Sequence, residues 1–158
     1  MSDLSRLDAV LESPIGRLGI RTDKESLLSV LFLPKEERTI APSSPLALEV
    51  QHQLSAYFNN KLTTFDLPLL IEGTSFQQKV LTALQSIAFG KTITYGQLAH
   101  GLATGPRAIG NACRRNPIPV IIPCHRVLSQ NGIGGYSGAT SGDLLTIKGW
   151  LLRHEADN

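Results

Sequence analysis

Acidic residues are missing from a long central part of this 158-residue chain. No Asp or Glu lies between Glu72 and Asp143, whereas two Lys and four Arg residues fall in that interval and give it a net charge of +6. The 72 residues before it carry 7 basic and 10 acidic groups, and the last 16 carry 2 and 3, so both flanks are negative. Because a carboxylate would repel phosphate, the interval favours a polyanionic partner over a merely solvated basic face.

Long apolar runs are also absent. No stretch approaches the roughly 18 apolar residues of a membrane-spanning helix. The first ten residues, MSDLSRLDAV, lack the basic start and apolar stretch of a secretory signal. We therefore expect a folded protein of the cytoplasm, or of the nucleus in a eukaryote, with no membrane partner. The length suffices for one solid core and a small second lobe.

Cysteine is scarce, and this limits two kinds of cross-link. Cys113 and Cys124 are too few for a disulfide framework, and a reducing compartment disfavours a single bridge between them. The four histidines are scattered without zinc-finger spacing. We therefore predict no metal site.

Short apolar runs dominate the first part of the chain. Residues 7–33 contain three such runs, separated by turn-forming residues at 13–16 and 23–25, which predicts a small antiparallel sheet. A loop at 41–45 leads into a predicted helix, and residues 67–71 allow one more strand. The apolar face of that helix is expected at helical spacing, on Leu46, Val50, Leu54, Tyr57 and Phe58. Residues 72–74 mark a boundary, so we expect lobes at 1–72 and 73–158.

The second lobe is predicted to be mainly helical, which makes the fold class α+β. Ser75 and Gln78 suggest a capping box that opens a helix ended by residues 89–91, with an apolar stripe on Phe76, Val80, Leu84 and Ile87. Two short helices at about 95–101 and 106–115, joined by a tight turn, predict a helix-turn-helix.

The end of the chain is predicted to carry a loop and a helix. Residues 120–122 suggest a buried strand that leads into an active-site loop at 123–127, and a glycine-rich loop at 131–142 follows. The inner face of the last helix is expected on Leu144, Ile147, Leu151 and Leu152.

Cys124 carries the clearest chemical signal. A lone buried cysteine is most often an inert small hydrophobe. Here it follows a proline and precedes His125 and Arg126, and two neighbouring basic groups favour the reactive thiolate. Adjacent side chains on a strand point in opposite directions, so adjacency alone does not bring His125 against the thiol. On these residues alone, inert packing stays open.

Several short motifs in chain order resemble the O6-alkylguanine-DNA alkyltransferase family. Residues 122–127 (IPCHRV) are similar to the family's signature around its reactive cysteine. The supporting matches are residues 73–77 (GTSFQ), 94–99 (TYGQLA), 107–110 (RAIG), 116–117 (NP), 135–138 (GYSG) and 150–152 (WLL), with His154 and Glu155. A single short motif gives false positives, whereas a series in register over roughly 80 residues rarely does.

The resemblance implies direct reversal of O6-alkylguanine in DNA, and of O4-alkylthymine, by irreversible transfer of the alkyl group to Cys124. His125 would deprotonate the thiol through a water, and Glu155 would orient the imidazole. Tyr95 would donate a hydrogen bond to the leaving oxygen. The alternatives are a core-anchoring Tyr95 and a surface Glu155 near a fraying end. Each molecule would react once, because a thioether does not hydrolyse, and no cofactor is implied.

The resemblance also implies that the helix-turn-helix docks in the minor groove of double-stranded DNA and flips the damaged base out. Arg107 would fill the gap, or alternatively contact phosphate. The further residues assigned to DNA are Thr94, Ala108, Gly110, Cys113, Arg114 and Arg115. Those assigned to the base pocket are Asn116, Val127, Ser137 and Lys148, with Cys124 and Val127 acting through their backbone. Asn116 would also tie the active-site loop to the helix-turn-helix. We expect a monomer and leave cooperative binding along DNA open.

Three features depart from the family pattern. The turn at 101–106 is about two residues shorter than usual, and the segment 139–146 is longer than in many relatives. Cys113 occupies a small or apolar position, and we interpret it as a packing residue and not as a second nucleophile.

Three other functions compete with alkyl transfer. A lesion-binding alkyltransferase-like protein carries tryptophan in place of the nucleophile, which the presence of Cys124 argues against. A sequence-specific regulator would need base-reading side chains, and residues 107–112 offer few. A thiol hydrolase is disfavoured because no helix N-terminus is expected behind the cysteine.

Overall fold

The computed structural model describes residues 6–136 and 142–156. The chain divides into two compact units, 1–71 and 72–158, one residue before the boundary expected from the sequence. The expected α+β class is confirmed: the first unit has a small antiparallel sheet with a helix, and the second is mainly helical. No helix within the described ranges is long and apolar enough to cross a membrane.

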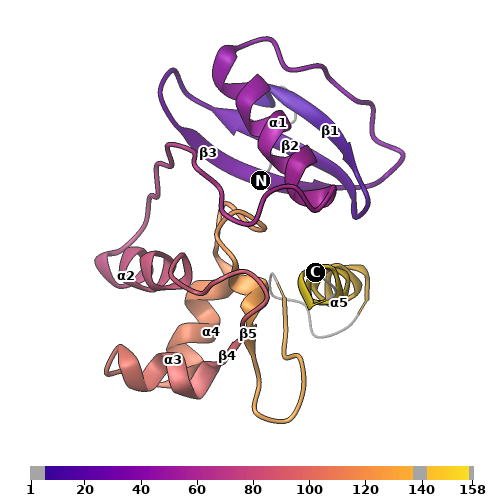
Figure 1. The fold of residues 1–158 in the computed structure, drawn as a ribbon. Coiled ribbons are helices and arrows are strands. Elements are labelled where there is room, and N and C mark those ends of the chain that lie inside the picture. Colours follow the sequence, from indigo (N-terminus) through magenta and orange to yellow (C-terminus); the bar gives the residue numbers. More distant parts are fainter. Residues whose placement is uncertain (1–5, 137–141, 157–158) are drawn as a thin grey trace. The chain divides into compact units, whose positions relative to one another are not determined.

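The first unit is a three-stranded antiparallel sheet with one helix packed on it (Figure 1). The strands are β1 (Ala9–Ser13), β2 (Gly16–Thr22) and β3 (Leu27–Leu33), in that order across the sheet. The helix α1 (Pro45–Phe58) packs against β1 and β2. Its start is defined by Ser44, whose hydroxyl accepts a hydrogen bond from the Ala47 N–H at 3.1 Å.

Two expectations for the first unit need correction. The buried face of α1 includes Gln53, because its amide exchanges two hydrogen bonds with the Asp66 backbone. The predicted Leu46 and Phe58 are only half-buried. Residues 67–71 make only an isolated bridge at Leu69, not a strand. Pro68 has no N–H, and its carbonyl accepts from the Leu27 N–H at 2.8 Å.

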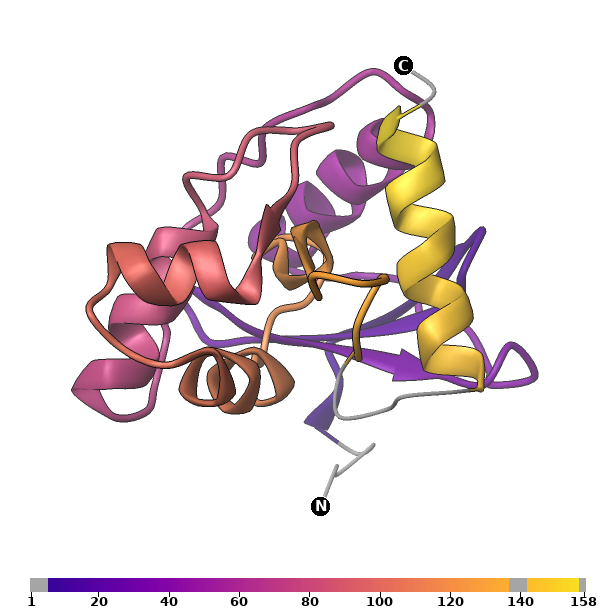
Figure 2. The same ribbon diagram turned by 90° about the horizontal axis from the view of Figure 1, so that it is seen from below.

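In the second unit, a short central segment contacts the last helix and one of the three other described helices, which pack on one another. The helices are α2 (Ser75–Leu84), α3 (Tyr95–Gly101), α4 (Pro106–Arg114) and α5 (Asp143–Ala156). The central segment is a 3-10 turn, η2 (Cys124–Arg126), followed by β5 (Val127–Leu128), which pairs in parallel with β4 (Ile93–Thr94). The turn η2 contacts α2 on one side and α5 on the other (Figure 2).

The two helices of the predicted helix-turn-helix, α3 and α4, lie within a residue of their expected bounds and pack against each other. The capping box of α2 is one residue earlier than predicted, on Thr74 and Gln77. That helix ends at Leu84, well before residues 89–91, because the next three N–H groups bond to carbonyls three residues back.

The apolar run at 120–122 forms a buried turn, so the strand predicted there is wrong. Val120 has φ +73°, and the Ile122 N–H donates to the Ile118 carbonyl at 2.9 Å. Pro117 and Pro119 lack the N–H groups that a ladder needs. A short, fully buried apolar run has the same composition in either conformation, so the sequence pattern could not separate them.

The inner face of α5 also differs from the prediction. Its buried residues are Lys148, Leu151 and Glu155, whereas Leu144, Ile147 and Leu152 are only half-buried. Hydrophobic periodicity cannot reveal a buried face on which two of three positions are charged. Lys148 and Glu155 instead make hydrogen bonds with the segments around Cys124.

Candidate active site

The thiol of Cys124 lies at the wall of a cavity of about 610 Å³ in the second unit. The cavity is lined from α3, α4, η2 and the loop at 129–136. Its lining includes Tyr95, Arg107, Gly110, Asn111, Cys113, Arg114, Cys124, Gly134 and Tyr136. Cys124 is nevertheless 3% exposed, so the cavity reaches a sulfur that bulk solvent barely touches. A ligand that enters the cavity can therefore reach a thiol that is otherwise shielded from bulk solvent.

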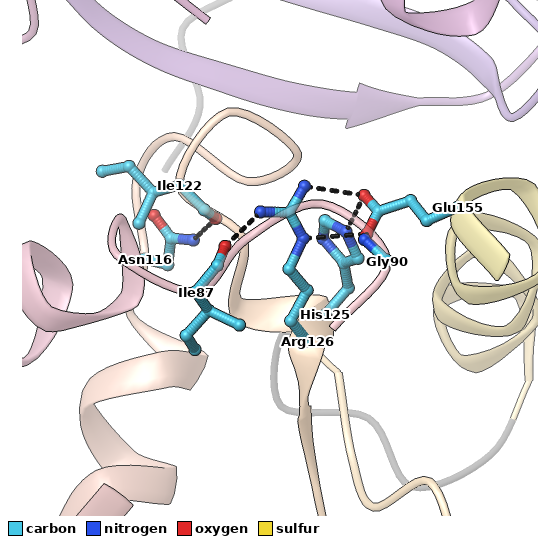
Figure 3. Close-up of polar contacts among 7 residues, drawn as sticks. All are labelled: Ile87, Gly90, Asn116, Ile122, His125, Arg126 and Glu155. Carbon is cyan, nitrogen blue, oxygen red and sulfur yellow. Dashed lines mark hydrogen bonds and ion pairs between the residues drawn. The ribbon is translucent and has the colours of Figure 1, made fainter. Parts of the chain in front are cut away.

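Asn116 orients the thiol and holds the turn that carries it. Its side-chain Nδ2 donates to the Cys124 Sγ at 3.1 Å and to the Ile122 carbonyl at 2.9 Å, and the second of these bonds is drawn in Figure 3. Its Oδ1 accepts from the Ile118 N–H at 2.9 Å. Asn116, which follows α4, thus ties this helix to the segment 118–124, and it also contacts the Cys124 thiol.

The Cys124 thiol is held in its neutral form. Burial raises its pKa to about 11, against the lowering effect of the Asn116 hydrogen bond and the nearby charge of Lys148. Cys113, which lines the same cavity, is also buried, and burial raises its pKa to about 12. The basic neighbours that were expected to favour the thiolate do not bring this pKa below its usual value, because desolvation outweighs the effects that lower it. The thiol needs a base when it reacts.

His125 and Glu155 form the expected pair. The His125 Nε2 lies 2.7 Å from the Glu155 Oε2, and both side chains are buried (Figure 3). The His125 Nδ1 is buried, and no group among the described residues hydrogen-bonds to it. Burial lowers the pKa of His125, with Arg126 and Lys148 adding to the decrease and Glu155 opposing it. A neutral imidazole with its proton on Nε2 offers Nδ1 as the basic nitrogen.

Arg126 is the functional neighbour whose contacts the sequence analysis missed. Its guanidinium binds both oxygens of Glu155, with Nε at 2.8 Å from Oε1 and Nη2 at 3.0 Å from Oε2. Its Nη1 donates to the Ile87 carbonyl at 2.6 Å. The residue was visible in the IPCHRV motif, but no local pattern indicates a partner 29 residues away on another helix.

Tyr95 and Lys148 both hydrogen-bond to the cavity-lining loop at 129–136. The Lys148 Nζ donates to the Val127 and Gly135 carbonyls at 2.7 and 2.9 Å, and the Tyr95 hydroxyl donates to the Gly135 carbonyl at 3.3 Å. Lys148 also lies 5.7 Å from the centre of the Tyr95 ring. Gly134 has φ +75°, and a Cβ there would lie 2.9 Å from the Tyr95 Cε2, so only glycine allows this approach.

The ionisation of these two side chains follows from their burial. Burial, with smaller contributions from Cys113 and Cys124, raises the pKa of Tyr95 to about 12, so its hydroxyl is a hydrogen-bond donor at neutral pH. Burial lowers the pKa of Lys148 to about 8. The Val127 carbonyl, expected to read the base edge, already accepts from Lys148.

The residues assigned to DNA fall into two groups. Arg107, Gly110, Cys113 and Arg114 line the cavity. Arg115 is exposed at the end of α4, Ala108 is half-buried, and Thr94 caps α3 by accepting from the Gln97 N–H at 3.0 Å; none of these three lines the cavity. Ser137 lies outside the described residues. Asn111, which the sequence analysis did not select, belongs to the lining.

This geometry places a buried cysteine in the wall of a cavity beside a two-helix motif. Two family models match: "6-O-methylguanine DNA methyltransferase, ribonuclease-like domain" over residues 7–71 and "6-O-methylguanine DNA methyltransferase, DNA binding domain" over residues 75–157. The chain belongs to the 6-O-methylguanine DNA methyltransferase family, as its sequence resemblance predicted.

Individual relatives agree over nearly the full length. The chain is 41% identical over 155 residues to a methylated-DNA–protein-cysteine methyltransferase of Methanosarcina acetivorans, covering 93% of this chain and 96% of that one. It is 36% identical to the constitutive enzyme of that name from Bacillus subtilis, covering 91% and 92%. The O6-methylguanine methyltransferase structure from Mycobacterium tuberculosis matches with a TM-score of 0.80 at 34% identity, covering 94% and 91%. A structure of the M. tuberculosis protein OGT in complex with DNA matches with a TM-score of 0.79 at 35% identity, also covering 94% and 91%.

The raised pKa of Cys124 gives a prediction for the free protein. Because the buried thiol ionises only as the pH approaches about 11, we expect alkylation of Cys124 by iodoacetamide to be slow at neutral pH. The rate constant should rise roughly tenfold per pH unit, since only the thiolate reacts. Peptide mass spectrometry in a Cys113→Ala background isolates this residue, and the urea-unfolded chain is the control. A rate that levels off below pH 9 would contradict the neutral resting thiol.

Proposed function

We propose that this protein repairs DNA by transferring an alkyl group from the O6 of guanine to the Sγ of its own Cys124, once per molecule. Membership of the family and the names of the relatives support the reaction type. The observation that carries the assignment to Cys124 is its position at the wall of a cavity, with a hydrogen bond from Asn116 and a Tyr95 hydroxyl in the same lining. O4-alkylthymine is proposed as a second substrate.

The chemistry balances without a cofactor. The thiol proton passes through a water to His125, and the sulfur attacks the saturated carbon of the alkyl group. A carbon–sulfur bond forms as the carbon–O6 bond breaks, and the electron pair goes to the guanine oxygen. The Tyr95 hydroxyl exchanges its 3.3 Å bond to Gly135 for a bond to that oxygen, where negative charge develops. The thioether has no ready route of hydrolysis, so the protein is consumed.

DNA binding is proposed to use α4 in the minor groove, with the damaged base flipped into the cavity. Arg107 and Arg114 lie at the cavity lining, where Arg107 can fill the space left by the base and Arg114 can reach the backbone. Gly110 has open space where a side chain would be, and Ala108 is small, so the DNA can approach the helix closely. Arg115 is assigned to phosphate contact. Thr94, which caps the start of α3, is also assigned to DNA binding. We propose that the protein acts as a monomer in the cytoplasm, or in the nucleus of a eukaryote.

The test is the intact mass of the protein after mixing with a duplex that contains O6-methylguanine. We expect the mass of one methyl group to be added to the wild type and to Cys113→Ala, and not to Cys124→Ala, because Cys124 alone is the acceptor. Excess DNA should add no second methyl. Lesion-selective binding without a mass change would instead indicate a damage sensor, and the absence of both would overturn the repair proposal.

The basic residues of α4 give a second prediction. Each phosphate contact that is lost should reduce the slope of log K against log salt concentration by about 0.9. We expect Arg114→Ala and Arg115→Ala to reduce it by this amount each, as measured by fluorescence anisotropy on undamaged duplex between low and physiological salt. Lys24→Ala removes an equal charge from the exposed β2–β3 turn and serves as the control. Equal slopes in all four proteins would exclude α4 as the phosphate-binding surface.

A further inference from the structure

The carboxylate of Glu155 interacts with three residues from two segments, the turn η2 and the backbone at Gly90. His125 binds Oε2 at 2.7 Å, and Arg126 binds both oxygens at 2.8 and 3.0 Å. The Gly90 N–H donates to Oε1 at 3.3 Å. Glu155 is 2% exposed, Arg126 6% and His125 0%, so these charges are removed from water together (Figure 3).

The guanidinium decides which group neutralises the carboxylate. A buried carboxylate is costly unless it is paired with a positive charge and fully hydrogen-bonded. The planar guanidinium supplies both through two parallel bonds, and it stays protonated at any pH a protein tolerates. His125 therefore does not need to be positive. Without Arg126, the carboxylate would draw a proton onto the imidazole to form a buried ion pair.

We propose that Arg126 is a positioning residue for alkyl transfer, which neutralises and fixes Glu155 so that His125 stays uncharged, with its proton on Nε2 and Nδ1 free as a base. This proposal rests on the proposed function for its kinetic consequence. The state of the imidazole, however, is a property of the free protein and can be measured without DNA.

The other charged groups around His125 are consistent with this role. Glu155 and Lys148 act on it from α5, and Arg126 acts from its own turn. The two cations disfavour a charged imidazole, whereas Glu155 favours it. The other helix that contacts η2 is α2, whose ionisable residue, Lys79, is exposed. Arg126 is thus the positive group that both binds the carboxylate and opposes protonation of the base.

Arg126→Met and Arg126→Lys separate positioning from simple packing. Methionine keeps much of the apolar stem and removes the charge, and lysine returns the charge without the two parallel bonds. Arg153→Met, an exposed arginine of α5, is the matched control. The readouts are the imidazole nitrogen resonances of His125 and the single-turnover transfer rate between pH 6 and 9, with folding monitored by circular dichroism.

In the wild type and in Arg153→Met, His125 should be the neutral Nε2–H tautomer at pH 7. In Arg126→Met, it should be protonated at that pH, and the transfer rate should fall roughly 100- to 10,000-fold, the contribution typical of a general acid–base group. The rate should recover as the pH rises, and Arg126→Lys should restore most of it at pH 7. A folded Arg126→Met with an unchanged imidazole and pH profile would overturn the proposal.

If Arg126→Met does not fold, the imidazole nitrogen resonances of His125 in the wild type still test the proposal. A charged His125, or one with its proton on Nδ1, would contradict the inference. Failure of the proposed function is distinguishable, because a wild type that gains no methyl group leaves the imidazole measurement valid.

Discussion

The carboxylate of Glu155 is the constraint on which the second unit depends. It lies on the inner face of α5 and is bound by the 3-10 turn that carries the nucleophile and by the backbone at Gly90. Arg126 extends this junction to the Ile87 carbonyl, just beyond α2. The turn η2 is therefore bonded to α5 through Glu155 and to the segment after α2 through the Ile87 carbonyl. The position of His125 follows from this junction, and that residue is the proposed base for the neighbouring thiol.

Seven residues before Glu155, α5 carries its second buried charge. Lys148 holds the Val127 and Gly135 carbonyls, which belong to the two ends of the loop that closes the cavity. The buried face of α5 thus contacts His125 through Glu155 and the cavity-lining loop through Lys148. Desolvation keeps the thiol and the phenol neutral at rest. The Tyr95 hydroxyl can therefore donate a hydrogen bond to a ligand atom on which negative charge develops.

The sequence predicted the elements well wherever short-range rules decide them. Spacing, turn residues and caps located the sheet, α1, α3 and α4, and the IPCHRV motif located Cys124 and His125. The prediction failed at 120–122, where a buried turn and a buried strand have the same apolar composition. It also failed on α5, because buried Lys148 and Glu155 look like surface residues until their partners are known. The bond between Arg126 and Glu155 joins residues 29 apart, and no local pattern encodes it.

The most direct test of the role given to this carboxylate is the free energy of unfolding of Glu155→Gln, measured by urea denaturation beside the exposed control Glu36→Gln. Glutamine keeps the shape but leaves the Arg126 guanidinium buried without a counter-charge. We predict a loss of about 3–5 kcal/mol for Glu155→Gln, and a change within about 0.5 kcal/mol for Glu36→Gln. A loss below about 1 kcal/mol for Glu155→Gln would contradict the account, because the unit would then stand without this interaction.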